Sequence, residues 1–174
     1  EVLKEEVNLE GGSVIPNRLA IHPMEGADAN PDGSPGKLNF RRYKRYAQGG
    51  AGLIWFEAIA INEKGRANDK QCFLNKNTVA GFKKMVDMIR EEAQNEYGKD
   101  KIPYLVIQLT HVGRFGQHNK ILFHHDLVDE APAASIPPDQ QVMEDKELKR
   151  LEEHFVEAAK LAKEAGYDSW WQYY

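Results

Sequence analysis

Residues with reactive or hydrogen-bonding side chains stand where three apolar stretches of the sequence end. The first stretch leads into His22, Pro23, Met24 and Glu25, the second into Glu57 and Ala58, and the third into Gln108, His111 and Arg114. In folds that alternate strands and helices, such strand ends lie together, and the loops after them carry the chemistry. An amide, an imidazole and a guanidinium brought together there would suit a planar heterocycle with hydrogen-bond donors and acceptors. The sequence therefore predicts a pocket for such a ring.

Several of these residues also have purely structural explanations. His22 is as easily a hydrogen-bonded core histidine as a neighbour of a bound ring. His111 and Arg114 would equally well brace a long loop in which Gly113 permits the turn. Gln108 favours a binding role, because a glutamine that closes an apolar strand needs a hydrogen-bond partner.

Signatures of other sites are missing from the sequence. Neither a Gly-x-Gly-x-x-Gly turn nor a phosphate-binding lysine loop follows the first strand, which argues against a Rossmann-type nucleotide site. His118, His124 and His125 lack the companion ligands and spacing of a metal site, so no metal is expected. Cys72 has no base or helix terminus near it that would lower its thiol pKa, and we expect it to be unreactive.

Strands must position these residues. A hairpin is expected within residues 1–16, a first strand around 18–22, and further strands at 53–61 and 104–109. The nearly continuous apolar run at 53–61 is typical of a strand that is covered on both faces, which indicates a parallel sheet. A fourth strand would begin near Tyr167.

Helices are predicted between these strands, because apolar residues recur there every three or four positions. They span 38–48, about 79–93 with Thr78 as a cap, and 148–165, where Gly166 follows. Strands alternating with helices form right-handed βαβ units. The pattern alone leaves both a doubly wound sheet and a barrel open.

Composition limits the class of protein. The 174 residues suit one domain, and a net charge of −4 argues against a nucleic-acid partner. No apolar run reaches the roughly 18–20 residues needed to cross a bilayer, so no membrane partner is expected. A single cysteine fits a cytoplasmic location.

Segments in order along the chain resemble the old yellow enzyme family, also called the NADH:flavin oxidoreductases. They are 17–24 (NRLAIHPM), 46–58 (from YAQ to EA), 65–66 (GR) and 108–114 (QLTHVGR). The resemblance implies an α/β fold that is the N-terminal half of a TIM (β/α)₈ barrel, in a single partial domain over residues 1–174. Within it, 1–16 would be the hairpin cap, 17–168 the first three to four βα units, and 169–174 an atypical aromatic tail.

The same resemblance implies an FMN-dependent oxidoreductase that uses NADH or NADPH and reduces the activated C=C bond of an enone-type substrate. By position, Pro23 and Met24 would lie along the flavin ring, Ala58 beside it, and Gln108 against its pyrimidine side. Glu25 departs from the Thr, Ser or Cys of many relatives, because an ionised carboxylate can only accept hydrogen bonds. We expect Glu25 to turn away or to act through its backbone amide.

The last residues depart further from the family pattern. After Asp168 the chain lacks the His-x-x-His or His-x-x-Asn pair that the family's fourth strand carries for its substrate. The alternative function is therefore a non-catalytic, truncated half barrel that self-associates or completes a barrel with another chain. Unpaired strand edges and an uncovered inner sheet face would drive that association.

Overall fold

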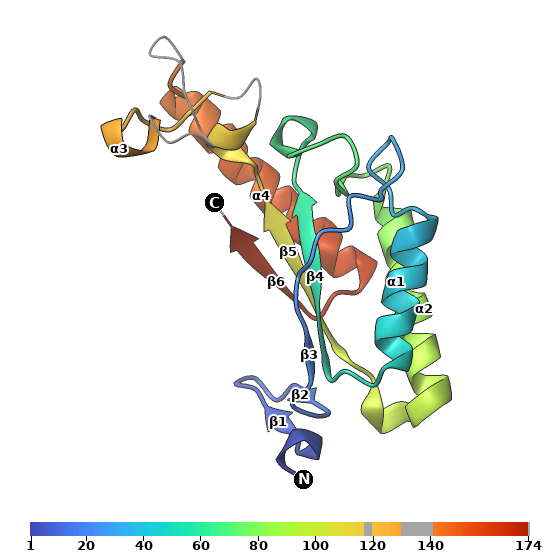
Figure 1. The fold of residues 1–174 in the computed structure, drawn as a ribbon. Helices are drawn as coiled ribbons and strands as arrows, with labels where there is room; N and C mark the ends of the chain where they lie inside the picture. The colour runs from blue at the N-terminus through green and yellow to red at the C-terminus, as the bar shows by residue number, and fades with distance from the viewer. Residues whose placement is uncertain (117–119, 130–140, 174) are drawn as a thin grey trace.

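Four parallel strands form the main sheet, in the order β3-β4-β5-β6 (Figure 1). They are β3 (Ala20–Ile21), β4 (Leu53–Ala60), β5 (Tyr104–Thr110) and β6 (Ser169–Tyr173). The structure, a computed structural model, describes residues 1–116, 120–129 and 141–173. Every strand lies beside its neighbour in sequence, as in one side of a barrel, whereas a doubly wound sheet reverses its order at a switch point.

Long helices cover one face of this sheet, and a short helix lies beyond the strand ends (Figure 1). They are α1 (Lys37–Gln48), α2 (Val79–Tyr97), the short α3 (Asp126–Asp129) and α4 (Asp145–Ala165). Single 3₁₀ turns lie at Val2–Lys4, Glu63–Gly65, Lys99–Lys101 and Gly113–Phe115. Helix α2 packs between α1 and α4, and Figure 1 shows α4 behind the strands and the opposite face open.

The predicted hairpin forms a small sheet of its own at the N-terminal side. Strands β1 (Val7–Asn8) and β2 (Val14–Ile15) pair antiparallel. The backbone N–H of Arg18 donates to the carbonyl of Leu3 at 2.9 Å, which ties the hairpin to the start of the main sheet.

The core lies between the sheet and its helices. Successive residues of a strand point to opposite faces, so each strand gives alternate side chains to the core. The fully buried apolar members from β4 and β5 are Ile54, Phe56, Ile59, Ala60, Leu105, Ile107 and Leu109. They meet the apolar faces of the helices, among them Phe82, Val86, Ile89, Phe155, Ala158 and Ala162. The periodic positions that predicted the helices are therefore the residues that bury them.

Strand β3 is shorter than expected. Ladder pairing is limited to Ala20 and Ile21, because the side chain of Asn17 bonds the backbone just before it. The Oδ1 of Asn17 accepts from Leu19 N and Gly52 N, both at 2.9 Å, and its Nδ2 donates to Gly50 O at 2.8 Å.

Two other local predictions differ from the structure. The fourth strand begins at Ser169, two residues after the predicted start at Tyr167, and Tyr167 is buried just before the strand. Thr78 is the N-cap of α2, but its side chain makes no capping bond. Its hydroxyl instead donates to Phe73 O at 2.7 Å and accepts from Asn75 N at 2.9 Å, in the turn before the helix.

A Tyr167→Phe change is expected to leave stability unchanged or to raise it by up to about 1 kcal/mol, because an unbonded buried hydroxyl costs free energy. The Tyr167 hydroxyl is buried and has no hydrogen-bond partner among the described residues. Tyr104→Phe is the matched control, since the Tyr104 hydroxyl donates to Asp168 O at 3.3 Å and its loss should not stabilise. Urea unfolding of both variants checks this, and a marked loss in Tyr167→Phe would contradict it.

Candidate functional site

A cavity of about 510 Å³ opens at the carboxyl ends of β4 and β5. Most of the predicted site residues line it: Glu25, Ala58, Gln108, His111 and Arg114. The prediction that three strand ends share one pocket is thus matched by the positions of these side chains.

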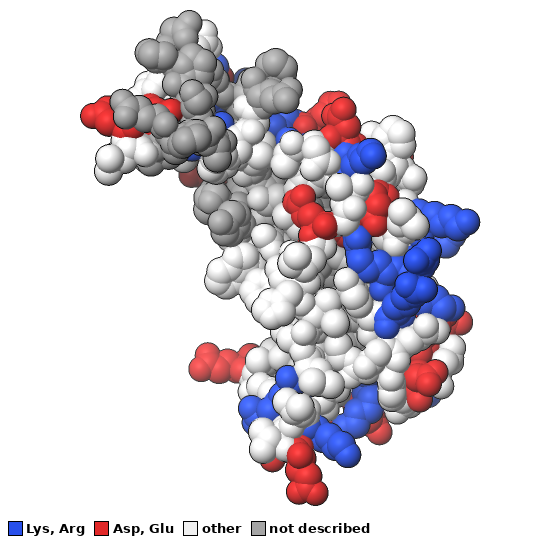
Figure 2. Space-filling model, viewed as in Figure 1, with Lys and Arg blue, Asp and Glu red and all other residues white. Residues whose placement is uncertain are grey.

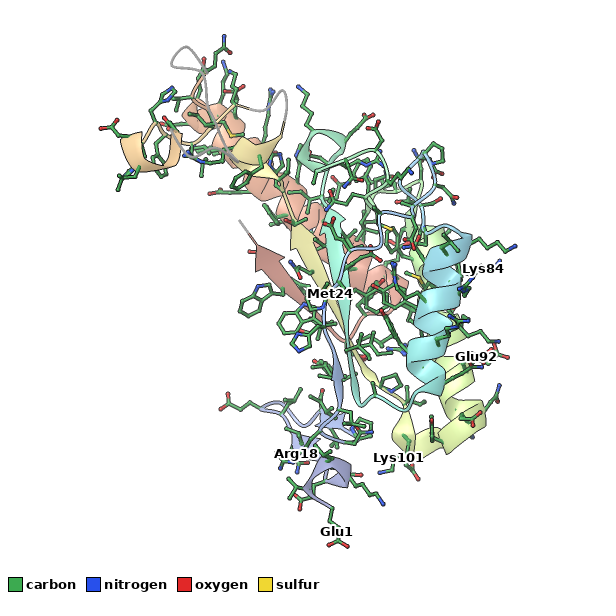
Figure 3. The ribbon with its side chains drawn as sticks, viewed as in Figure 1. Glu1, Arg18, Met24, Lys84, Glu92 and Lys101 are labelled. Atoms are coloured by element: carbon green, nitrogen blue, oxygen red, sulfur yellow. The ribbon has the colours of Figure 1, made fainter. Side chains whose placement is uncertain are left out.

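The stretch just before Glu25 is placed differently. His22, Pro23 and Met24 are not among the residues that line the cavity. Met24 is 69% exposed, and Figure 3 shows it in front of the sheet, where no helix covers the strands. These residues reach the cavity only through their chain connection to Glu25.

Ala58 and Gln108 face the cavity side by side. They are register partners on β4 and β5, and a bulge between Trp55 and Ala58 adds one residue to β4 just before this pair. Because of the extra residue, Ala58 faces the cavity and Glu57 faces the helices. The side-chain amide of Gln108 makes no hydrogen bond to any described residue, so its donor and acceptor are available to a ligand.

Glu25 is held by Gln71, a residue that sequence reasoning did not single out. The buried Gln71 amide donates to Glu25 Oε1 and to Ala58 O, both at 3.0 Å, and its oxygen accepts from Ala67 N at 2.6 Å. Partial burial, with the charge of Glu57, raises the pKa of Glu25, while the Gln71 bond opposes that rise. The side chain of Glu25 therefore lines the cavity and does not turn away, contrary to one of the two expectations for it.

Nothing in the sequence marks Gln71 as a site residue. It lies in a polar stretch without periodicity, and only tertiary contacts bring it between Glu25 and Ala58. A buried glutamine with every polar group bonded holds two walls of a cavity in fixed relation.

His111 is buried and closes one side of the cavity. Its Nδ1 accepts the backbone N–H of Gly113 at 3.1 Å, and Gly113 adopts φ +58°. The ring also packs on Gly65, where an added Cβ would come within 2.7 Å of His111 Cδ2. Burial, with a smaller contribution from His154, lowers the pKa of His111. The ring is a neutral, loop-bracing histidine, in agreement with the structural explanation.

The stability of the fold should fall as the pH drops below about 6.5, the ordinary histidine pKa. The lowered pKa of folded His111 means that the unfolded chain takes up a proton first. Urea midpoints at pH 7 and pH 5 would show a smaller pH slope in His111→Gln, by at most about 1.4 kcal/mol per pH unit. His125→Gln, at an exposed histidine, is the control; equal slopes in all three proteins would contradict the assignment.

Arg114 braces the loop that follows β5. It forms an ion pair with Asp129 at 2.8 Å, donates to Phe123 O at 3.0 Å, and lies over the Phe123 ring. His124 Nδ1 is 2.8 Å from the other oxygen of Asp129. Arg114 lines the cavity, but its guanidinium is largely committed to this loop.

The remaining candidates for reactive groups are the other histidines and the single cysteine. His118 lies outside the described residues, and within those described no group of three His, Cys, Asp or Glu side chains could hold a metal ion. Cys72 is buried, and desolvation raises the pKa of its thiol far above its ordinary value. The thiolate form needed for reactivity is therefore disfavoured, as the sequence predicted.

Comparison with known proteins gives a family match over most of the chain. Residues 10–170 match the "NADH:flavin oxidoreductase / NADH oxidase family". Among relatives, the NADPH dehydrogenase of Bacillus pumilus is 32% identical over 164 residues, 90% of this chain and 44% of the relative. That of Listeria monocytogenes serotype 4a is 32% identical over 161 residues, 88% of this chain and 43% of the relative.

Solved structures agree on the fold. Morphinone reductase has a TM-score of 0.75 at 23% identity, covering 98% of this chain and 47% of that one. The old yellow enzyme homologue from Zymomonas mobilis has a TM-score of 0.76 at 20% identity, covering 99% and 48%. The fold is thus that of half a TIM barrel, and the chain spans less than half the length of the relatives it matches. In the described part of the chain, no helix has the length and apolar character to span a membrane.

Proposed function

The chain belongs to the NADH:flavin oxidoreductase / NADH oxidase family, and from that premise we propose that it supplies one wall of an FMN site. The proposed activity is an FMN-dependent, NAD(P)H-using oxidoreductase that reduces the activated C=C bond of an enone-type substrate. FMN would supply the redox chemistry, receiving hydride from the nicotinamide donor and delivering it to the substrate.

The unpaired amide of Gln108 is the observation that carries this proposal. A half-buried amide beside a cavity, without a hydrogen-bond partner among the residues that the structure describes, is suited to a ring edge that offers one acceptor and one donor. The neighbouring Ala58 has a side chain small enough to let a flat ring approach β4. We therefore propose Gln108 for the pyrimidine side of a flavin and Ala58 for a place beside its ring.

Glu25 and the backbone around Pro23 and Met24 would border the same ring. The Glu25 carboxyl, held at one oxygen by Gln71, presents an acceptor when ionised and a donor when protonated. His111 and Arg114 would act mainly by shaping the cavity wall, and substrate contacts are proposed for neither beyond that.

FMN titration of the purified chain tests the proposal. Wild type is expected to retain the visible flavin absorbance after desalting, and Gln108→Leu should weaken FMN binding about tenfold, because one ligand hydrogen-bond set is lost. Gln94→Leu, the same change at an exposed position of α2, should bind as wild type does. Wild type that releases all FMN on desalting, or Gln108→Leu that binds equally well, would contradict the proposal.

A second candidate is a non-catalytic half barrel that self-associates. The open face supports it: Trp171, in register with Gln108 on β6, is 53% exposed, and Figure 2 shows few charges over the centre of this face. Its neighbour Trp170, which points to the other side of the strand, is 48% exposed. The outer edges of β3 and β6 pair with no other strand among the described residues. Light scattering over a concentration series distinguishes the two, since this candidate requires a colourless protein whose mass rises with concentration.

A further inference from the structure

A buried carboxylate lies directly behind the cavity wall. Glu57 is 2% exposed, and the bulge in β4 turns its side chain toward α1. Its Oε1 accepts from Asn39 Nδ2 at 3.2 Å, from Tyr43 Oη at 3.3 Å and from Arg42 Nη2 at 2.5 Å. Its Oε2 accepts the backbone N–H of Gly26 at 3.0 Å. One oxygen is thus committed to the helix, and the other to the loop that contains Glu25.

Arg42 makes the second link between helix and loop. Its guanidinium forms a two-pronged pair with Asp28, at 2.9 and 3.2 Å, while also bonding Glu57. Burial alone would lower the pKa of Arg42, but the carboxylates of Glu57 and Asp28 raise it, so the group stays charged.

The loop fits closely against this guanidinium. A Cβ built on Gly26 would come within 1.6 Å of Arg42 Nη1. A side chain at this position would therefore displace the Arg42 guanidinium from its present place, whereas glycine lets the backbone amide reach Glu57 beside it. Glu25 directly precedes Gly26, and Asp28, two residues after it, is held by the same Arg42 guanidinium.

We propose that Glu57 and Arg42 are positioning residues that clamp the loop at residues 25–28 and so set the place of Glu25 beside the cavity. Glu57 precedes Ala58 in β4, and Gly26 follows Glu25, so the Glu57–Gly26 bond joins two cavity walls by one contact. If Arg42 served only to neutralise the charge of Glu57, no bond to the loop would be needed. The additional bond between Glu57 and the Gly26 amide is therefore what supports a positioning role. The expected effect on FMN binding rests on the proposed function, whereas the positioning of the loop by Glu57 and Arg42 does not.

Hydrogen exchange of the Gly26 amide, measured by NMR on the full chain, reads the clamp directly. In wild type, one Glu57 oxygen accepts from Gly26 and the other accepts from the donors of α1. Glu57→Gln leaves a single acceptor oxygen for both sets of donors, so Gly26 exchange is expected to speed up about tenfold or more. Arg42→Lys keeps the charge but loses the planar fork that bonds Asp28 and Glu57 together. It is the second variant if Glu57→Gln does not fold, and it should also speed Gly26 exchange and weaken FMN binding severalfold.

Tyr43→Phe and Arg41→Lys are the controls. Tyr43→Phe removes two other bonds of Glu57, the one donated to Oε1 and the one accepted from its backbone N–H, but leaves the Gly26 contact. It should therefore reduce global stability while Gly26 exchange and FMN affinity stay at wild-type values. Arg41 is exposed on the same helix, and its change should alter nothing.

The outcomes separate the clamp from the proposed function. Faster Gly26 exchange together with weaker FMN binding in Arg42→Lys, but not in Tyr43→Phe, supports the inference. Unchanged Gly26 exchange in both Glu57→Gln and Arg42→Lys overturns it, as do losses that follow global stability equally in all variants. If the Gly26 amide of wild type exchanges slowly but the protein binds no FMN, the proposed function is contradicted. The exchange rates of the variants then still test whether Glu57 and Arg42 hold the loop.

Discussion

An Arg42→Met variant is expected to lose about 3–5 kcal/mol of unfolding free energy at pH 7, because it leaves buried carboxylates without their counter-charge. The side chains of Glu57 and Asp28 are only 3% and 11% exposed. Methionine fills a similar volume, so the loss would come from the charges and not from a cavity. Urea unfolding followed by circular dichroism gives the difference.

Arg45→Met is the matched control: Arg45 is exposed on the same helix, and its change should stay within about 0.5 kcal/mol of wild type. An Arg42→Met protein as stable as the Arg45→Met protein would contradict the assigned role of the buried ion pairs.

A Phe56→Ala variant is expected to lose about 3–5 kcal/mol through a different cause, the cavity that it leaves in the core. Phe56 is fully buried. Its ring stacks on Tyr43 with centroids 4.3 Å apart and meets the edge of Tyr167 at 4.7 Å. Removing it separates α1, β4 and the start of β6 at one point.

Salt and pH should leave this second loss unchanged, because the Phe56 side chain carries no charge. Phe115→Ala, at a position 63% exposed, is the control and should alter the urea midpoint little. If Phe56→Ala unfolded at the wild-type midpoint, the packing of α1 on β4 described above would be wrong.

Much of the fold could be predicted from residue patterns, because burial of apolar side chains determines both the spacing of apolar residues in the sequence and the packing of the elements. The apolar run at 53–61 indicated a strand covered by helices, and β4 has that environment. The helix over 148–165 was predicted from its apolar spacing, and the same residues contact the sheet. Strand β3 was overestimated, because the Asn17 side chain bonds the backbone just before it, which no periodicity reveals.

The site was predictable only where residues lie in or directly after strands. Ala58 and Gln108 line the cavity together because parallel strands place their carboxyl ends at one edge. Gln71 was missed, since two of its three side-chain hydrogen bonds, to Glu25 and to Ala58 O, join segments that are distant in the sequence. The environment of Glu57 was missed as well, because simple alternation in β4 would have pointed it toward the cavity.

The extra residue in β4 restricts how this strand can change in length. Removing one residue between Trp55 and Ala58 would remove the bulge and keep Ala58 beside Gln108, but it would leave a single helix-facing position for the two side chains, Phe56 and Glu57, that now point to the helices. Related sequences should therefore resist insertions and deletions within this strand.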